Sequence, residues 1–266
     1  MSILFSAGSI IFYYISAALL LRRLTTGIQA TQRSKLIALF FGIPAIALHL
    51  MVIYDQMLLP QGLNLSLFHV LSLTAWLIST LVVLFAFRQP VENLGIIVFP
   101  VSALTLLLQI VWGGTTGQIG IDTVGVKAHV LLSLLAFSLL NIAAIQAVLL
   151  WIQTRHLRNR HPGGFVRALP PLETMEQLLF RMIAIGYVLL TLSLLTGITF
   201  IHDIFAQHLV HKTVLTIIAW FVFALLLWGR WHYGWRGRVA VRWTLSGFAV
   251  LMLAYFGSKM VLELIL

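Results

Sequence analysis

Nine histidines occur in this chain, and four of them fall near the ends of apolar segments, where metal chemistry is possible. His129 opens one apolar segment, His202 closes the next, and His208 and His211 follow in the connection after it. Neutral imidazoles bind metal ions, including haem iron, which takes one or two axial histidines. The spacing of the last three is not a diagnostic metal-ligand pattern, and a solvated loop is the simpler interpretation for His208 and His211. His129 and His202 remain candidate axial ligands to a haem iron.

The residues around these histidines could supply the rest of a haem site. Haem b needs apolar walls, aromatic rings and cations that pair with its propionates. Lys127 and Lys212 offer the cations, and Trp112 and Phe200 offer rings, all near the same predicted helix ends. The segments that carry His129 and His202 run in opposite directions, so these two ends can be neighbours and can hold both faces of an iron. The alternative is that His129 and His202 have no functional role.

His49 lies within an apolar segment, about two-thirds of the way across it. An imidazole at that depth needs a polar partner, because hydrocarbon offers none. His69 comes a few residues into the following segment and reaches a similar depth, so the two can pair if their helices face each other. His49 is therefore expected inside the bundle, either as a haem ligand or as a polar contact to another helix.

The elements that must position these side chains are membrane-spanning helices. Hydrophobic residues make up 61% of the chain and charged residues 9%, and the mean hydropathy is +1.02. A hydrocarbon core needs a helix of about 20 apolar residues. Such runs are found at 3–21, 36–54, 66–87, 94–112, 127–153, 177–201, 213–229 and 243–265. The connections are too short for a separate soluble domain, so we predict an all-α integral membrane protein, a single transmembrane domain over 1–266 with a bundle of about eight helices.

The distribution of positive charge predicts how this bundle is oriented. All but three of the seventeen Lys and Arg residues follow one set of alternate connections, the exceptions being Lys127, Lys212 and Lys259. Because short basic loops stay in the cytoplasm, both termini and the His129 end are expected outside, in a bacterial inner membrane. The net charge of +10 then indicates contact with anionic lipids at the inner face and not with nucleic acid.

Other chemistry has little support in the sequence. The chain has no cysteine, which excludes thiol exchange and thiolate metal sites. The few carboxylates fall in predicted loops or near the end of the chain, so a proton-pumping chain of acids is not expected. No catalytic nucleophile or acid/base pair is evident, and we predict an assembly or binding protein in place of an enzyme.

Several segments, mostly in the second half, follow a recognisable order. KAHVLLSLLAFSLLNIAA opens a helix with histidine, LPPLETMEQLLFRM ends a connection, and LTLSLLTGI precedes KTVLTIIAWFVFALLLWGRWHYGWRGR. In this order the chain resembles the cytochrome c assembly family, membrane haem-handling proteins of the CcsA and CcmC type, and in particular its small YpjD-like branch. Lys212, Trp220, Phe223 and the run 234–238 stand where the family has a lysine, two spaced aromatics and a G-W-x-G-R turn.

The resemblance implies haem binding and delivery of haem to apocytochrome c outside the membrane, with other cytochrome c maturation proteins as partners. His129 matches the family's outer ligand and His49 its early transmembrane histidine. The sequence departs from the family where HDIFAQHLVHKT replaces the tryptophan-rich loop and where Trp228 replaces a second transmembrane histidine. Either His202 and its neighbours replace the lost ligand, or this branch no longer transfers haem.

The leading functional prediction is therefore a haem-binding protein of cytochrome c biogenesis that works at the outer membrane face. The alternative is a non-haem accessory or regulatory subunit of an ion or metal transport system, with a histidine-containing pocket for an ion or a partner. A haem absorbance spectrum separates the two.

Overall fold

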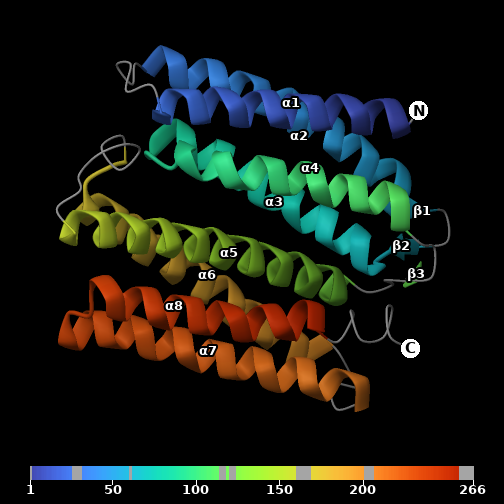
Figure 1. Ribbon diagram of the computed structural model, residues 1–266. Helices are drawn as coiled ribbons and strands as arrows, with labels where there is room; N and C mark the ends of the chain where they lie inside the picture. The colour runs from blue at the N-terminus through green and yellow to red at the C-terminus, as the bar shows by residue number, and fades with distance from the viewer. Residues whose placement is uncertain are drawn as a thin grey trace. The chain divides into compact units, whose positions relative to one another are not determined.

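The computed structural model describes residues 2–25, 32–59, 62–113, 118–119, 124–159, 169–200 and 207–257. In these ranges the chain forms eight helical segments long and apolar enough to cross a membrane, of which the fourth runs from Glu92 to Trp112 and the eighth from Gly237 to Gly257. Figure 1 shows them in chain order. Their bounds are α1 Ser2–Thr25, α2 Gln32–Met57, α3 Leu67–Arg88, α4 Gly95–Trp112, α5 Val124–Arg158, α6 Leu172–Phe200, α7 Gln207–Tyr233 and α8 Gly237–Met252. The predicted number of spans is thus confirmed.

Short elements complete the described ranges. A 3-10 turn, η1 Glu92–Leu94, precedes α4, and a π-helical turn, η3 Leu253–Gly257, extends α8. Three strands, β1 Leu58–Leu59, β2 Gly62–Asn64 and β3 Gln118–Ile119, form an antiparallel sheet in that order. Leu58 pairs with Leu63, and Leu63 pairs with Ile119. This small sheet ties the connection after α2 to the one after α4, and the sequence analysis did not predict it.

Two span boundaries differ from those expected. The sequence predicts the final span at 243–265, whereas α8 already begins at Gly237. His208 and His211 were placed in a loop, whereas α7 begins at Gln207 and includes both. The physical reason is the same in each case, because a helix continues beyond its apolar part as long as its backbone hydrogen bonds can form, and interfacial water tolerates polar side chains there.

The helices group into two compact units, α1–α4 with the small sheet and α5–α8. In the first unit α1 packs closely on α2 and α4. Small residues line this packing: Ser9 donates a hydrogen bond to the carbonyl of Ala45, and Ser16 donates one to the carbonyl of Ala38, each at 2.8 Å. Small hydroxyl side chains let helix backbones approach in a membrane and satisfy each other's polar groups.

In the second unit α5 is the central helix and packs on both α6 and α8. It is the most buried of the eight spans. Small residues again set the distance, since an added Cβ on Gly186 of α6 would lie 2.8 Å from the side chain of Leu140 on α5. Phe137 of α5 packs against the rings of Tyr255 and Phe256 in η3. These contacts bring the start of α5, the end of α6 and the end of α8 to one end of this unit.

Candidate functional site

A cavity of about 130 Å³ opens at that end of the second unit. His129 of α5 and Lys212 of α7 both line it, and both belong to the predicted haem site. The remaining lining is apolar or hydroxylated and comes from all four elements at this end: Ser133, Ser193, Leu194, Gly197, Ile198, Thr213, Thr216 and Tyr255. Two residues that are far apart in the sequence, and that the sequence analysis assigned to one site, are therefore brought together.

The imidazole of His129 is held in a defined orientation. Its Nδ1 atom lies 2.8 Å from the backbone carbonyl oxygen of Ser193. A carbonyl only accepts hydrogen bonds, so Nδ1 carries the proton and donates it. In the neutral ring Nε2 then holds the lone pair, which is the atom that binds metals when the other nitrogen is fixed by a carbonyl. The half-buried His129 thus lines the cavity with one ring nitrogen engaged by a backbone carbonyl.

A glycine makes room for this ring. A Cβ atom added to Gly197 of α6 would lie 3.0 Å from Cε1 and 3.2 Å from Nδ1 of His129. That is closer than a carbon atom normally approaches an imidazole, so any larger residue at this position would displace the ring or the helix. Gly197 belongs to the segment LTLSLLTGI, and the sequence analysis did not recognise it as part of the site.

Lys212 supplies a positive charge to the same cavity. Its Nζ atom lies 5.2 Å from the centre of the Tyr255 ring, in a cation–π contact. Within the described ranges no carboxylate forms an ion pair with it. A cation with an aromatic neighbour and no acidic partner is suited to an anionic group on a ligand.

The other residues assigned to this site lie elsewhere or are not described. Lys127 is exposed at the start of α5. Trp112 belongs to the first unit, where it is 61% exposed and stacks on Phe68 with ring centres 6.2 Å apart. Phe200 packs against Gly125, whose added Cβ would lie 2.3 Å from the ring. His202 lies outside the described residues, and of the histidines on the first turns of α7, His211 is exposed.

His49 lies in the core of the first unit and is fully buried, as the sequence predicted. Its Nε2 is 2.8 Å from the hydroxyl oxygen of Ser72, and its Nδ1 is 3.2 Å from that of Tyr13. His69 was considered as its partner, but it bonds to Ser66 at 2.6 Å. Because both nitrogens of His49 are engaged, the structure shows the polar-contact arrangement, and a haem-ligand role would have to break one of these bonds.

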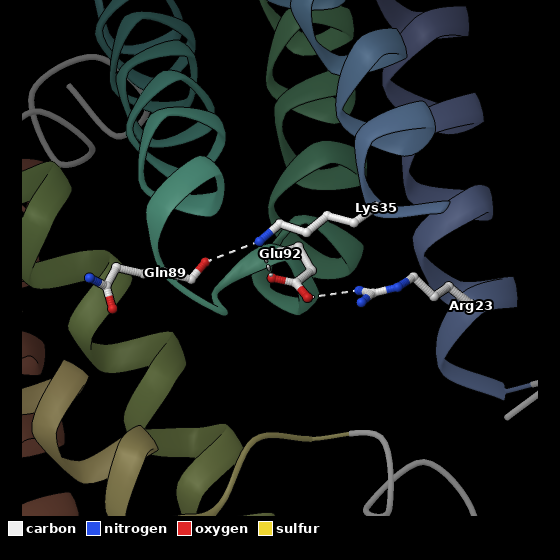
Figure 2. A network of polar contacts seen from close by, with 4 residues as sticks. All are labelled: Arg23, Lys35, Gln89 and Glu92. Atoms are coloured by element: carbon white, nitrogen blue, oxygen red, sulfur yellow. Dashed lines mark hydrogen bonds and ion pairs between the residues drawn. The ribbon is translucent and has the colours of Figure 1, made fainter. Parts of the chain in front are cut away.

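A buried carboxylate organises the end of the first unit where α1 ends and α2 begins. Glu92 of η1 is 6% exposed and pairs with Arg23 of α1 at 2.7 Å and with Lys35 of α2 at 3.3 Å. Lys35 also approaches the backbone carbonyl of Gln89 at 3.4 Å. Figure 2 shows these side chains converging from three elements. In the sequence Arg23, Lys35 and Glu92 resemble ordinary loop charges. Their ion pairs could have been suspected only from their positions near three helix ends.

The G-W-x-G-R run forms a tight turn between α7 and α8. Gly234 and Gly237 adopt positive φ angles of 65° and 54°, which side chains with a Cβ rarely adopt. Glu176 of α6 accepts a hydrogen bond from the backbone N–H of Gly237 at 2.7 Å and pairs with Arg236 at 3.5 Å. Trp235 packs over Gly229 of α7. The turn is thus structural, and Glu176 is a partner that the sequence analysis did not foresee.

The fold and the cavity together define a class: a polytopic helical membrane protein with a histidine and a lysine in one cavity near its helix ends. The chain belongs to the cytochrome c assembly protein family, whose model matches residues 34–266. That match covers α2 through α8 and includes both His129 and Lys212. No solved structure matches the chain.

Several curated relatives are similar over different lengths. Inner membrane protein YpjD of Escherichia coli strain K12 is 36% identical over 98% of this chain and 98% of its own length. A 28.8 kDa protein of Azospirillum brasilense, from a nifR3-like 5′ region, is 29% identical over 59% of this chain and 56% of its own. Cytochrome c biogenesis protein CcsA of Microcystis aeruginosa is 30% identical over 33% of this chain and 27% of its own.

Proposed function

We propose that this protein serves cytochrome c biogenesis in the inner membrane and binds haem b in the His129 cavity, handling or delivering it at the outer face. The observation that carries the proposal is the fixed orientation of His129, whose Nδ1–H is donated to Ser193 while Nε2 is left for a metal. Family membership supports the biogenesis role, and the YpjD and CcsA relatives support the location and the process.

The lining residues fit one side of a haem. His129 offers an axial nitrogen, Lys212 offers a cation for a propionate, and Leu194, Ile198 and Tyr255 offer apolar and aromatic surface. The volume of about 130 Å³ is below the roughly 300 Å³ or more of a typical ligand pocket. The cavity by itself is thus too small for a whole haem, and only the ligand side and one edge of the macrocycle would lie in it. Ile198 of α6 is 65% exposed, and the rest of the porphyrin ring would lie outside the cavity against this side chain.

When bound, haem supplies an iron that takes axial nitrogen ligands and a vinyl-bearing ring that biogenesis attaches to an apocytochrome. The chain's own residues bind and orient. Ser193 fixes the tautomer of His129, Gly197 leaves space for its ring, and Lys212 would pair with an anionic group of the bound haem. His202 remains the proposed opposite ligand and Lys127 the proposed second propionate cation. Trp112 remains the proposed ring contact and His49 remains a proposal of the resemblance, and the contacts described for both lie within the first unit.

The alternative of a bare metal ion has weaker support in the described residues. No group of three or more His, Cys, Asp or Glu side chains gathers in that part of the chain. A divalent cation beside His129 would also be repelled by the ammonium group of Lys212, which has the same sign of charge. Haem avoids this conflict, because its iron is held by the porphyrin and its propionates are negative.

The test is the absorbance spectrum of the full chain, purified after expression with ample haem supply. A low-spin Soret band is expected with two axial ligands, and His202→Ala should convert it to a high-spin form or release the haem. His211→Ala is the matched control, since its exposed imidazole lies outside the cavity lining. A haem-free wild-type protein would remove this proposal in favour of the accessory-subunit alternative.

The proposed outer location has its own test. The chain has no cysteine, so single cysteines can be introduced without background. Val124→Cys at the His129 end of α5 should react with an impermeant thiol reagent in intact cells, and Asn159→Cys beyond its other end should not. The reverse pattern would place the cavity on the cytoplasmic side.

A further inference from the structure

A second and larger hollow lies at the opposite end of the second unit, between α5 and α8. Its volume is about 780 Å³, and it is open to the surface. The two helices that border it run antiparallel (Figure 1). Four arginines line it: Arg155, Arg158, Arg238 and Arg242. None of the described lining residues carries a carboxylate. The nearby Glu176 is engaged with the N–H of Gly237 and with Arg236, which is not part of the lining.

The four arginines lie at helical spacing and face the same space. Arg155 and Arg158 are one turn apart on α5, and Arg238 and Arg242 are one turn apart on α8. All four are exposed, and none forms an ion pair with a carboxylate within the described ranges. Like charges that line one groove repel one another, and an anion bound among them would relieve that repulsion. Guanidinium groups match the geometry of phosphate oxygens and bind them in pairs.

The groove changes character along its length. Further toward the middle of the span its lining consists of Trp151 and Val148 on α5 and of Leu245 on α8, while Val241 lies between the two arginines of α8. From Arg158 to Val148 the helix rises about 15 Å toward the apolar middle of the span, at 1.5 Å per residue. Trp151 stands between the two parts, with the guanidinium of Arg155 5.5 Å from its ring centre. Tryptophan is enriched at the boundary between headgroups and hydrocarbon.

We propose that this groove is a binding site for one anionic phospholipid, whose phosphate lies among the four arginines and whose acyl chain lies along Val148, Trp151 and Leu245. A soluble phosphate compound would use the arginines alone and would gain nothing from the apolar part. The graded lining therefore favours a lipid, and the predicted orientation places it in the inner leaflet, where anionic headgroups are abundant. The site is separate from the His129 cavity and does not depend on haem.

The test measures phospholipid retained by the detergent-purified full chain, using native mass spectrometry with added dioleoyl phosphatidylglycerol or dioleoyl phosphatidylcholine. The wild type should retain phosphatidylglycerol selectively. Arg158→Gln/Arg238→Gln should lower its affinity about tenfold or more, since each basic residue near a headgroup contributes on the order of 1 kcal/mol. Arg33→Gln/Arg181→Gln is the control, because it removes the same charge from exposed arginines outside the groove.

A second variant tests the apolar part without changing charge. Leu245→Trp should fill the inner groove and lower phosphatidylglycerol retention, while leaving any binding of inorganic phosphate or glycerol 3-phosphate unchanged. It also carries the test if the double arginine variant does not fold. Equal retention by the groove and control variants would overturn the site. Competition by the soluble phosphates together with normal binding in Leu245→Trp would overturn the lipid assignment.

Discussion

The two units hold their polar groups in opposite ways, and the difference is clearest at two histidines. His49 in the first unit is fully buried, and Tyr13 and Ser72 occupy both of its ring nitrogens. His129 in the second unit is half-buried, uses one nitrogen for a backbone carbonyl and turns the rest of its ring toward a cavity that it shares with Lys212. A histidine whose two ring nitrogens are both hydrogen-bonded within the protein stabilises the packing, whereas a histidine that keeps one nitrogen for a cavity can bind a ligand there.

The charged ends repeat this contrast. Glu92 buries its carboxylate between Arg23 and Lys35 in the first unit. In the second unit the arginines that line the α5–α8 groove have no such acidic partner in the described ranges. The first unit therefore carries the features of a scaffold, and the second carries both candidate binding sites.

His129→Ala is expected to have the largest effect on haem. Removing this imidazole should lower haem content at least about tenfold. Even the loss of a residue that only hydrogen-bonds to a metal ligand typically lowers metal affinity by about 10- to 100-fold. The measurement is the ratio of Soret to protein absorbance in the purified protein, with melting temperature as a control for folding. Full haem content with an unchanged low-spin spectrum would remove His129 from the site.

Glu92→Gln should have the largest effect on stability. The substitution leaves the side chains of Arg23 and Lys35 without their shared counter-charge in a mostly buried location, and breaking such a pair costs about 3–5 kcal/mol. Thermal unfolding in detergent should show a clearly lower melting temperature with an unchanged haem spectrum per folded protein. Glu176→Gln is the comparison, and it should cost less because Arg236 is mostly exposed. Equal effects would contradict the contrast between the units.

His49→Leu tests whether the closed histidine is structural. The substitution leaves the hydroxyl groups of Tyr13 and Ser72 without their bonds in the core, at a cost of about 1–3 kcal/mol. A lower melting temperature with normal haem content is expected. Loss of the haem spectrum in a protein that melts normally would instead assign His49 to a haem site, as the family resemblance suggested.

Gly197→Ala should have the smallest effect of the four. Its methyl group would lie 3.0 Å from the His129 ring and displace the imidazole, so haem affinity should fall about fivefold, which corresponds to the lower end of the roughly 1–3 kcal/mol that overpacking typically costs. Thr199→Ala on the exposed side of the same helix is the control. A haem titration followed by absorbance measures both, and equal affinities would mean that the ring adapts to the methyl group without loss.

The eight spans could be predicted from the sequence. A run of about twenty apolar residues can cross a membrane only if its backbone N–H and C=O groups are hydrogen-bonded to each other, and a helix does this within a single segment. His49 was placed inside the bundle for the same reason, since hydrocarbon leaves an imidazole without partners. The pairing of His129 with Lys212 in one site was also predictable, from the alternating direction of consecutive spans. These inferences depend only on local composition and chain direction.

Tertiary structure alone decided which partners those residues have. Tyr13, Ser72 and Ser193 look like ordinary span residues in the sequence, and only packing turns the first two toward His49 and the carbonyl of the third toward His129. Glu92 and Glu176 resemble other loop carboxylates until several helix ends converge on them. The α5–α8 groove depends on two helices that are distant in the sequence. Composition sets which segments enter the membrane, but side-chain contacts between segments depend on rotation and depth, which no local pattern specifies.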